Sequence, residues 1–233
     1  MTYLYMGKII LLRHGQSQWN LENRFTGWTD VDLSDQGRQE ARTAGEKILK
    51  AGLKPRYYFT SYLKRAIHTL QIAADAMDRN WVPVVKDWHL NERHYGALQG
   101  LDKAETARKY GDEQVHLWRR SYEVTPPALS PDDLRSPANE DKYAALSADE
   151  LPLTESLKLT IERVRPCWEE FIAPAIRLYD TVLVAAHGNS LRALAMILLH
   201  LSADDVMKLE IPTGSPWVME LDGHLNVVKE YYL

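Results

Sequence analysis

Two short apolar runs, far apart in the sequence, each end at a histidine. Ile9-Ile10-Leu11-Leu12 leads into Arg13-His14-Gly15, and Thr181–Ala186 leads into His187-Gly188-Asn189. Apolar runs of this length that stop at glycine and polar residues predict buried β-strands. The chain is therefore expected to form a sheet in which each histidine stands where its strand ends.

Four more segments have the pattern of short strands: Arg56–Thr60, Val82–Val85, and a pair near Trp217–Leu221 and Leu225–Tyr231. Between the strands, apolar residues recur at helical spacing, as they do within residues 63–77, 157–168 and 191–198. A further helix is expected to begin after Ser34 as its N-cap and to end at Gly52. This alternation predicts an α/β fold of three layers, with a mostly parallel central sheet and helices on both faces.

The stretch from Ser121 to Pro152 breaks the alternation. Its prolines stand among polar residues, at Pro126, Pro127, Pro131, Pro137 and Pro152. The stretch is too long for an ordinary connection, so we expect an ordered insertion or lid at about 121–152. The 233 residues allow one large α/β domain or two small ones, and we predict a single domain over residues 1–233.

Composition narrows the class of function. With 28 Lys and Arg against 32 Asp and Glu, the formal charge of −4 argues against nucleic-acid binding. The single cysteine, Cys167, excludes an intramolecular disulfide and a cysteine-based zinc site. No apolar run reaches membrane-spanning length, and MTYLYMGKIILL lacks a basic leader and a small-residue cleavage site. A cytoplasmic protein with no membrane or nucleic-acid partner is expected.

Three polar groups are predicted to meet at one edge of the sheet. Ligands of open α/β sheets bind outside the carboxyl ends of the strands, and Ser61 and Arg65 follow another predicted strand. Arg13 and Arg65 suit a phosphate clamp because a guanidinium pairs two phosphate oxygens at once. A neutral histidine that donates one ring N–H to a backbone carbonyl keeps its other nitrogen for attack. Together these groups predict a phosphate-handling site.

Plainer interpretations remain beside this one. A histidine after a strand is usually a satisfied polar residue, and a lone Arg-His-Gly tripeptide is weak evidence. Paired histidines also suggest a metal site, but the sequence has no HExxH spacing or carboxylate cluster to support one. The second His-Gly and the arginine after a third strand favour the phosphate site.

Longer segments carry a resemblance to a known family. They include LLRHGQSQWNLENRFTGW (11–28), NERHYGALQGLDKAETARKYG (91–111), WRRSYEVTPP (118–127) and AAHGNSLRAL (185–194). In this order they resemble the cofactor-dependent phosphoglycerate mutases of the histidine phosphatase superfamily, over nearly the whole chain. The RHG motif alone points only to the superfamily and its fold, whereas NERHYGALQGL and WRRSYEVTPP point to the mutase branch.

The resemblance implies a role for each matching residue. His14 is similar to the nucleophile that becomes phosphohistidine, Glu92 to the proton donor and acceptor, and His187 to the histidine that stabilises the moving phosphoryl group. Arg13 and Arg65 match the phosphate clamp. The clamp and Glu92 are also expected to bind substrate, together with Gly15, Ser17, Asn20, Thr26, Gly27, Arg93, Tyr95, Lys103, Arg119, Arg120, Gly188 and Asn189.

The implied reaction interconverts 3-phosphoglycerate and 2-phosphoglycerate, in glycolysis and gluconeogenesis. It passes through a phosphohistidine primed by 2,3-bisphosphoglycerate and uses no metal, with minor bisphosphoglycerate synthase and phosphatase side activities. The partners implied are small-molecule phosphoglycerates and a second or further copies of the chain, as a homodimer or homotetramer. Two alternatives stay open: a broad phosphomonoesterase of the same superfamily, and a non-catalytic protein that binds phospho-ligands.

Overall fold

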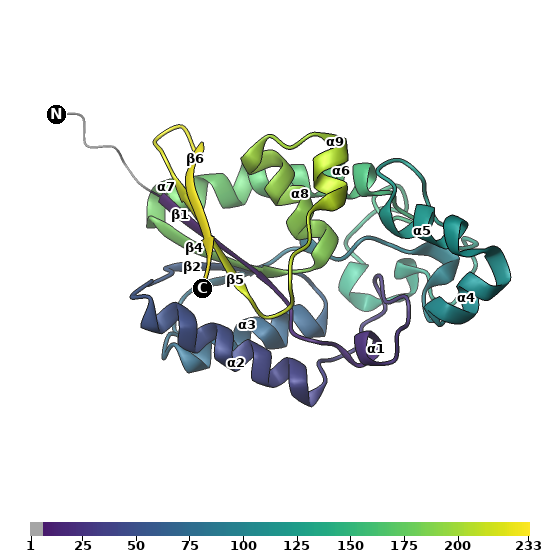
Figure 1. Cartoon of the computed structure of the whole chain (residues 1–233), viewed down its shortest axis with the longest axis horizontal. Coiled ribbons are helices and arrows are strands. Elements are labelled where there is room, and N and C mark those ends of the chain that lie inside the picture. Colours follow the sequence, from purple (N-terminus) through teal and green to yellow (C-terminus); the bar gives the residue numbers. More distant parts are fainter. Residues whose placement is uncertain (1–6) are drawn as a thin grey trace.

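The computed structural model describes residues 7–233, and a six-stranded sheet runs through its centre (Figure 1). The strand order is β3-β2-β4-β1-β5-β6. Four strands run parallel: β1 (Gly7–Arg13), β2 (Tyr57–Thr60), β3 (Val84–Lys86) and β4 (Thr181–Ala186). At one edge, β5 (Pro216–Leu221) pairs antiparallel with β1, and β6 (Val227–Tyr232) pairs antiparallel with β5. The predicted mostly parallel α/β sheet is confirmed.

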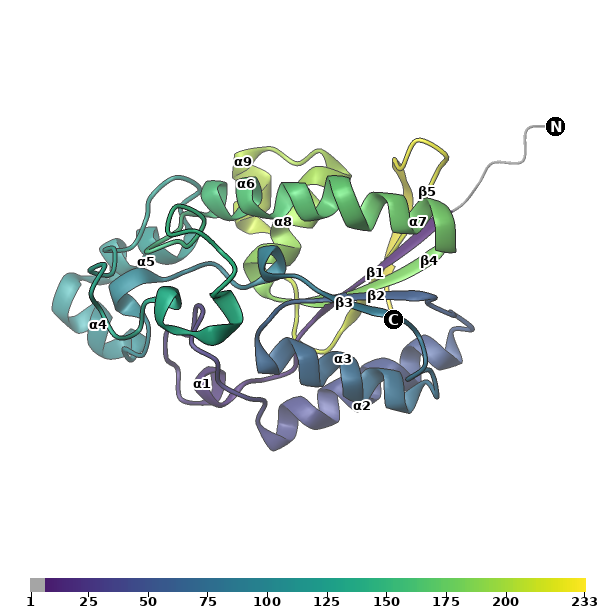
Figure 2. The same cartoon turned by 180° about the vertical axis from the view of Figure 1, so that it is seen from behind.

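Helices cover both faces of this sheet, as the two opposite views show (Figures 1 and 2). On one face lie α2 (Asp35–Lys50) and α3 (Lys64–Ala76). On the other face lie α6 (Leu157–Cys167), α7 (Ala173–Tyr179) and α8 (Gly188–Leu199), with α9 (Ala203–Lys208) beside α8. Three short helices lie beyond the carboxyl end of β1: α1 (Gln18–Leu21), α4 (Lys103–Tyr110) and α5 (Asp112–Arg120).

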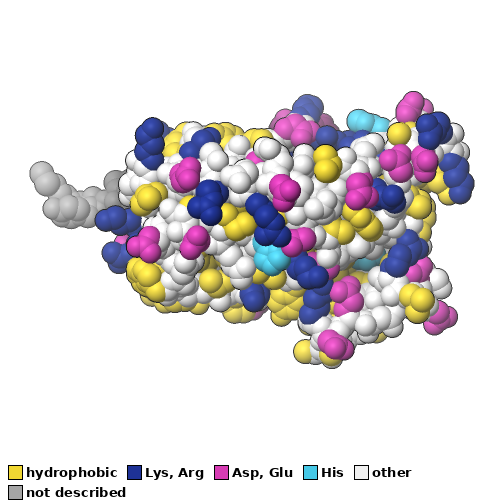
Figure 3. Space-filling model, turned by 90° about the horizontal axis from the view of Figure 1, so that it is seen from below, with side chains coloured by type: hydrophobic (Ala, Val, Ile, Leu, Met, Phe, Trp, Pro, Cys, Tyr) yellow, Lys and Arg dark blue, Asp and Glu magenta, His cyan; other side chains and the backbone are white. Residues whose placement is uncertain are grey.

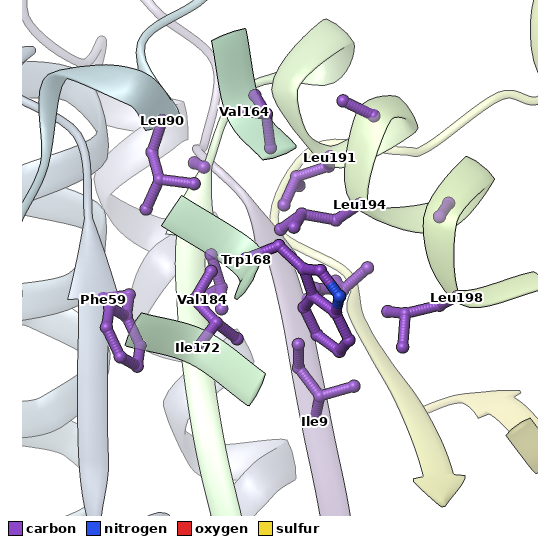
Figure 4. Packing of buried hydrophobic residues seen from close by; sticks show 14 of the residues in the cluster. Ile9, Phe59, Leu90, Val164, Trp168, Ile172, Val184, Leu191, Leu194 and Leu198 are labelled. Atoms are coloured by element: carbon purple, nitrogen blue, oxygen red, sulfur yellow. The ribbon is translucent and has the colours of Figure 1, made fainter. Parts of the chain in front are cut away.

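The strands fill two separate cores because their side chains alternate between the faces of the sheet. Ile9 and Leu11 of β1 belong to the core beneath α6 and α8, whereas Ile10 and Leu12 belong to the core above α2 and α3. Figure 4 shows the first core, where Trp168 packs among Ile9 and the apolar side chains of α8. The apolar run of β1 is continuous because both faces of this strand are covered.

The element ends follow from local chemistry. The Ser34 hydroxyl caps α2 by accepting a hydrogen bond from the Gly37 N–H, and Gly52 follows the helix with a φ of +70°, as predicted. The strand predicted at Val82–Val85 begins later, at Val84, because Pro83 has no N–H to pair. The last predicted strand also begins later, at Val227, because Leu225 sits in the turn with a φ of +66°.

Residues 121–152 form an irregular segment with two turns of 3₁₀-helix, η3 (Pro137–Asn139) and η4 (Asp141–Tyr143). Its Tyr143 packs against Trp28 and accepts a hydrogen bond from Asn91 at 2.8 Å. Arg135 donates to the carbonyls of Ala97 and Gln99. The segment is therefore fastened onto the loops that follow β1 and β3.

On the face of the molecule that Figure 3 shows, acidic and basic side chains are interspersed with apolar ones. Within residues 7–233 no helix combines the length and the apolar character needed to span a bilayer. The prediction about a leader concerns in part residues 1–6, which lie outside the described residues.

The contact between α2 and α3 generates a stability prediction at Gly45. A Cβ at this position would lie 2.4 Å from the Ala73 carbonyl oxygen and 2.8 Å from the Ala76 Cβ. Gly45→Ala should therefore lower the free energy of unfolding by about 1–2 kcal/mol, although alanine is the better helix former by about 1 kcal/mol. Urea unfolding checks this, with the exposed Thr43→Ala on the same helix as control. A stabilised Gly45→Ala would contradict the close approach of the helices.

Candidate active site

The pairing of β1 with β4 brings the two strand-end histidines together. Arg13 lies opposite Ala186 in this parallel ladder, and the His14 N–H donates to the Ala186 carbonyl at 2.9 Å. The next residues along both strands are His14 and His187, whose ring centroids are 5.0 Å apart. Because Thr60 of β2 lies opposite Ala185, Ser61 reaches His187, with 2.8 Å between its Oγ and Nε2.

The His14 ring is oriented by the backbone of its neighbour. Its Nδ1 lies 2.7 Å from the Gly15 carbonyl oxygen, which can only accept, so Nδ1 carries the proton and Nε2 keeps its lone pair. Only 3% of the residue is exposed. Burial lowers the pKa of His14 well below its usual value, and the positive charges of Arg65 and Arg13 lower it further. His14 is thus a neutral imidazole with one nitrogen available for attack.

His187 is fully buried beside it at the start of α8. Burial lowers its pKa well below the usual value, with further lowering by Arg65 and His14. A neutral imidazole next to a serine hydroxyl is a hydrogen-bonding group rather than a fixed positive charge. A neutral imidazole keeps one N–H, so the role implied for His187 in stabilising a phosphoryl group is that of a hydrogen-bond donor.

Two buried arginines place positive charge beside His14. Arg65, from the first turn of α3, donates to the carbonyls of Gly27 at 2.7 Å and Thr29 at 3.0 Å. Burial lowers its pKa to about 10, which leaves it charged at neutral pH. Arg13 donates from Nη1 to the Ile211 carbonyl at 2.7 Å, and its buried Nε has no hydrogen-bond partner among the described residues. Both side chains are anchored while their charge remains available to an anion.

The Glu92 carboxylate is fixed at one oxygen. Oε1 accepts hydrogen bonds from the Asn189 N–H at 3.1 Å, the Asn189 amide at 2.9 Å and the Arg93 N–H at 2.8 Å. All three bonds fall on Oε1, and the residue lines the same cavity as His14. Oε2 can therefore take up or release a proton while Oε1 holds the side chain in place.

The loop that carries Glu92 is supported from behind by a buried ion pair. Arg163 of α6 pairs with Glu155 at 2.6 Å, with only 6% and 4% of the two side chains exposed. Arg163 also donates to the carbonyls of His89, Asn91 and Glu92. The apolar stripe of α6 gives no hint of this contact, because Arg163 does not belong to the stripe.

His14, Glu92 and the two arginines line a cavity of about 200 Å³, whereas His187 lies behind His14 and is not part of the lining. Most of the predicted site residues line it: Arg13, His14, Asn20, Thr26, Gly27, Arg65, Glu92, Tyr95, Lys103, Arg119, Arg120, Gly188 and Asn189. Burial, with the positive charge of Arg119 close by, lowers the pKa of Lys103. Lys103, Arg119 and Arg120 add positive charge to the lining beyond that of Arg13 and Arg65.

Three predicted substrate-binding residues do not line the cavity. Gly15 lies against α2, where a Cβ would come within 2.2 Å of the Gly37 carbonyl oxygen. Ser17 caps α1 and exchanges hydrogen bonds with Asn20, which does line the cavity. Arg93 is buried behind α5. Each of the three shapes the site from outside the cavity lining, and their contact with substrate stays a prediction.

The contacts of Arg93 show how it acts on its neighbours. Its Nη2 donates to the carbonyls of Trp118 at 3.1 Å and Arg119 at 2.8 Å, at the end of α5. Its guanidinium lies 4.6 Å from the centre of the Tyr95 ring. Arg93 thus holds the end of the helix that carries Arg119 and Arg120.

Four residues of the cavity were not predicted: Arg24, Phe25, Arg192 and Glu210. Arg24 and Phe25 lie within the motif at 11–28, and Arg192 lies one helical turn after Gly188, a spacing that places it on the same side of α8. Nothing in the pattern around Glu210 marked it. Within residues 7–233 no three His, Cys, Asp or Glu side chains come together in a way that could hold a metal ion.

The arrangement has the parts needed for phosphoryl transfer. A neutral histidine supplies a nucleophilic nitrogen, and buried arginines are pre-positioned where an anion would sit. A carboxylate with one available oxygen can exchange a proton with a hydroxyl. The cations supply charge stabilisation of the kind that phosphoryl transfer requires.

Solved structures show the same fold. A mycobacterial glucosyl-3-phosphoglycerate phosphatase superposes with a TM-score of 0.71 at 23% identity, covering 97% of both chains. A putative alpha-ribazole-5'-P phosphatase from Escherichia coli gives a TM-score of 0.68 at 18% identity, covering 97% of this chain and 94% of the other. Bacillus stearothermophilus YhfR gives 0.68 at 22% identity, covering 93% and 92%.

The sequence itself gives the family. Residues 9–138 and 131–233 match the histidine phosphatase superfamily (branch 1), and these two segments contain every residue from β1 onward that the site uses. Two of these three neighbouring structures carry the name of a phosphatase. With this match, the shared fold and the His14 site, the chain belongs to branch 1 of the histidine phosphatase superfamily, whose members are phosphoryl-transfer enzymes.

Proposed function

We propose that this protein interconverts 3-phosphoglycerate and 2-phosphoglycerate through a phosphohistidine at His14. The observation that carries the proposal is the extent of positive charge in the cavity. Arg13 and Arg65 stand beside the nucleophile, and Lys103, Arg119 and Arg120 line the cavity as well. Transfer of one phosphoryl group needs one anion-binding site beside the nucleophile. A phosphoglycerate also has a carboxylate, and a bisphosphoglycerate has a second phosphate, so these substrates need further cations.

The same cations fit 2,3-bisphosphoglycerate as a primer. When bound, this molecule would supply the phosphoryl group that loads His14. Arg13 and Arg65 would hold the phosphate next to the His14 Nε2, and the outer cations would hold the remaining anionic groups. Loading the enzyme therefore calls for the same contacts as turnover.

The proposed steps use this chain's residues symmetrically. Phosphorylated His14 gives its phosphoryl group to the free hydroxyl of a monophosphoglycerate, while Glu92 accepts the hydroxyl proton. The N–P bond breaks as the new O–P bond forms, and the lone pair returns to the His14 Nε2. In the second half, His14 takes the other phosphoryl group and Glu92 returns the proton to the leaving oxygen.

A second candidate function is hydrolysis of a phosphomonoester. It is favoured by the neighbouring phosphatases, one of which acts, by its name, on a phosphoglycerate derivative. A second observation points the same way: among residues 7–233, none from 121–152 lines the cavity, so this segment does not cover it here. Water that reached phosphorylated His14 would turn transfer into phosphatase activity.

One assay separates the two functions. The purified protein is incubated with 3-phosphoglycerate, with and without 2,3-bisphosphoglycerate, and both 2-phosphoglycerate and free phosphate are measured. We expect isomer formation to exceed phosphate release and to increase when the bisphosphate is added. Phosphate release without isomer would overturn the mutase proposal in favour of the phosphatase.

The nucleophile can be tested by substitution. His14→Ala should abolish acid-labile phosphoenzyme and lower turnover by at least about a thousandfold, since covalent transfer then has no acceptor nitrogen. Phosphoenzyme is measured with labelled substrate after a quench with detergent at alkaline pH and gel separation, and its acid lability is checked by treating a parallel sample with acid. The exposed His224→Ala is the matched control and should retain both signals. Phosphoenzyme that persists in His14→Ala would identify another nucleophile.

The lowered pKa values of His14 and His187 predict how stability depends on pH. Both histidines stay neutral in the folded protein but take up protons in the unfolded chain below about pH 6.5. Unfolding therefore becomes easier as pH falls from 6.5 towards the lowered pKa, by about 1.4 kcal/mol per pH unit for each histidine. Urea unfolding at several pH values should show a shallower acid-side loss for His14→Gln. An unchanged slope would mean that folding does not hold His14 neutral.

A further inference from the structure

Three consecutive residues after α9 contact three arginines of the cavity. The Leu209 carbonyl accepts from the Arg192 Nε at 2.7 Å, and the Ile211 carbonyl accepts from the Arg13 Nη1 at 2.7 Å. Between them, the Glu210 carboxylate lies 2.6 Å from the Arg120 Nη1 and 3.5 Å from the Arg192 Nη2. Glu210 thus puts an anion between two guanidinium groups that line the cavity.

The two guanidinium groups need such an anion. Arg192 is largely buried, with 11% of its side chain exposed, and 34% of the Arg120 side chain is exposed. Burial and the positive charge of Arg120 both lower the pKa of Arg192, and Glu210 acts against them. The two positive charges repel each other, and a carboxylate that pairs with both lowers this repulsion.

Glu210 itself is poorly fixed at its carboxylate end. Its side chain is 64% exposed, and such surface ion pairs contribute little to stability. The flanking backbone is fixed by contrast, because the carbonyls on both sides of Glu210 are bonded to Arg192 and Arg13. Rotation of one side chain into solvent is therefore enough to vacate the place between the arginines.

We propose that Glu210 is a displaceable latch, a carboxylate that occupies the place between Arg120 and Arg192 until an anionic group of the substrate replaces it. This inference rests on the proposed function in one respect, since it takes the substrate to carry a second anionic group. The displacing group would be a carboxylate or phosphate, because a planar guanidinium pairs the oxygens of either.

The latch makes Glu210 a specificity-determining residue. A ligand with one anionic group binds beside His14 and leaves Glu210 in place, so its binding free energy includes no cost for breaking the ion pairs of Glu210. A ligand with a second anionic group must first break the ion pairs of Glu210. Only a group that pairs well with both Arg120 and Arg192 offsets the free energy lost with the ion pairs of Glu210. Ligands with a neutral group at this position are therefore bound less tightly.

The test compares two non-transferable probes that differ by one carboxylate. In 4-phosphonobutyrate the carboxylate is as many atoms from phosphorus as in 3-phosphoglycerate, and the C–P bond prevents transfer to His14. Propylphosphonate lacks the carboxylate. Dissociation constants for both are measured by calorimetry on the full chain, as wild type, Glu210→Gln and Glu169→Gln. Glu169 pairs with Arg165 at 3.7 Å and is 59% exposed, so its variant makes the same charge change away from the cavity.

Glu210→Gln should bind 4-phosphonobutyrate about two- to fivefold more tightly, the worth of an exposed ion pair, with propylphosphonate nearly unchanged. Glu169→Gln should leave both constants unchanged. An equal increase in affinity for both probes would mean that the substitution acts only through the net charge of the cavity, and would overturn the latch. Unchanged or weaker 4-phosphonobutyrate binding would mean that Glu210 supports the arginines without being displaced, and would overturn it too.

The two proposals fail separately. If wild type forms no 2-phosphoglycerate, but Glu210→Gln still binds 4-phosphonobutyrate more tightly and propylphosphonate unchanged, the mutase function fails and the latch stands. If wild type forms 2-phosphoglycerate without that selective gain, the mutase function stands and the latch fails.

Discussion

The parallel pairing of β1 with β4 is the constraint on which the site depends. Its register sets Arg13 opposite Ala186, and the His14 N–H continues the ladder by one more bond. A shift of one residue would turn the side chains of β1 to the opposite faces and carry His14 away from His187. The continuous burial of Ile9, Ile10, Leu11 and Leu12 in two cores makes such a shift costly. Hydrophobic packing therefore fixes the distance between two polar residues.

Two pairs of arginines that line the cavity, an inner and an outer pair, differ in how their charge is held. The inner ones, Arg13 and Arg65, donate to backbone carbonyls, which anchor the side chains without cancelling their charge. Burial, helped by that uncancelled charge, lowers the pKa of His14 and keeps it neutral, and the same charge leaves an attractive place for a phosphate. The outer pair, Arg120 and Arg192, shares the carboxylate of Glu210. The positive charge of the inner pair is thus always available to an anion. The charge of the outer pair becomes available, by our proposal, only when an anion replaces Glu210.

Positioning of Glu92 involves much of the molecule. Asn189 of α8 holds its carboxylate, and Arg163 of α6 holds the carbonyls of its loop. The segment 121–152 packs on the other side of that loop through Tyr143 and Asn91. Helix packing on one face of the sheet is therefore coupled to the placement of Glu92, the group proposed to exchange a proton with substrate.

The sequence by itself determined the fold class and the location of the chemistry. In strands the apolar residues alternate or form a continuous run, and in helices they recur about every 3.6 residues. These patterns placed the six strands of the sheet to within a few residues. The rule that ligands bind at the carboxyl ends of parallel strands then brought Arg13, His14, Arg65 and His187 to one edge. Local patterns suffice for this because the periods of strands and helices are set by neighbouring residues, whereas the hydrogen bonds that pair the strands join segments far apart in the sequence. The role of Glu92 came from the resemblance, since no local rule separates it from other glutamates.

Only the tertiary structure decided which polar residues face the cavity and which support it. Arg93 and Ser17 stand in motifs next to true cavity residues, yet their side chains turn to the end of α5 and the start of α1. Glu210 and Arg163 enter through contacts with residues far away in sequence, on other elements. An arginine or glutamate in a loop has the same sequence pattern whether it meets a solvated neighbour or an active site. Its partner, and with it its role, is set by the packing of distant segments.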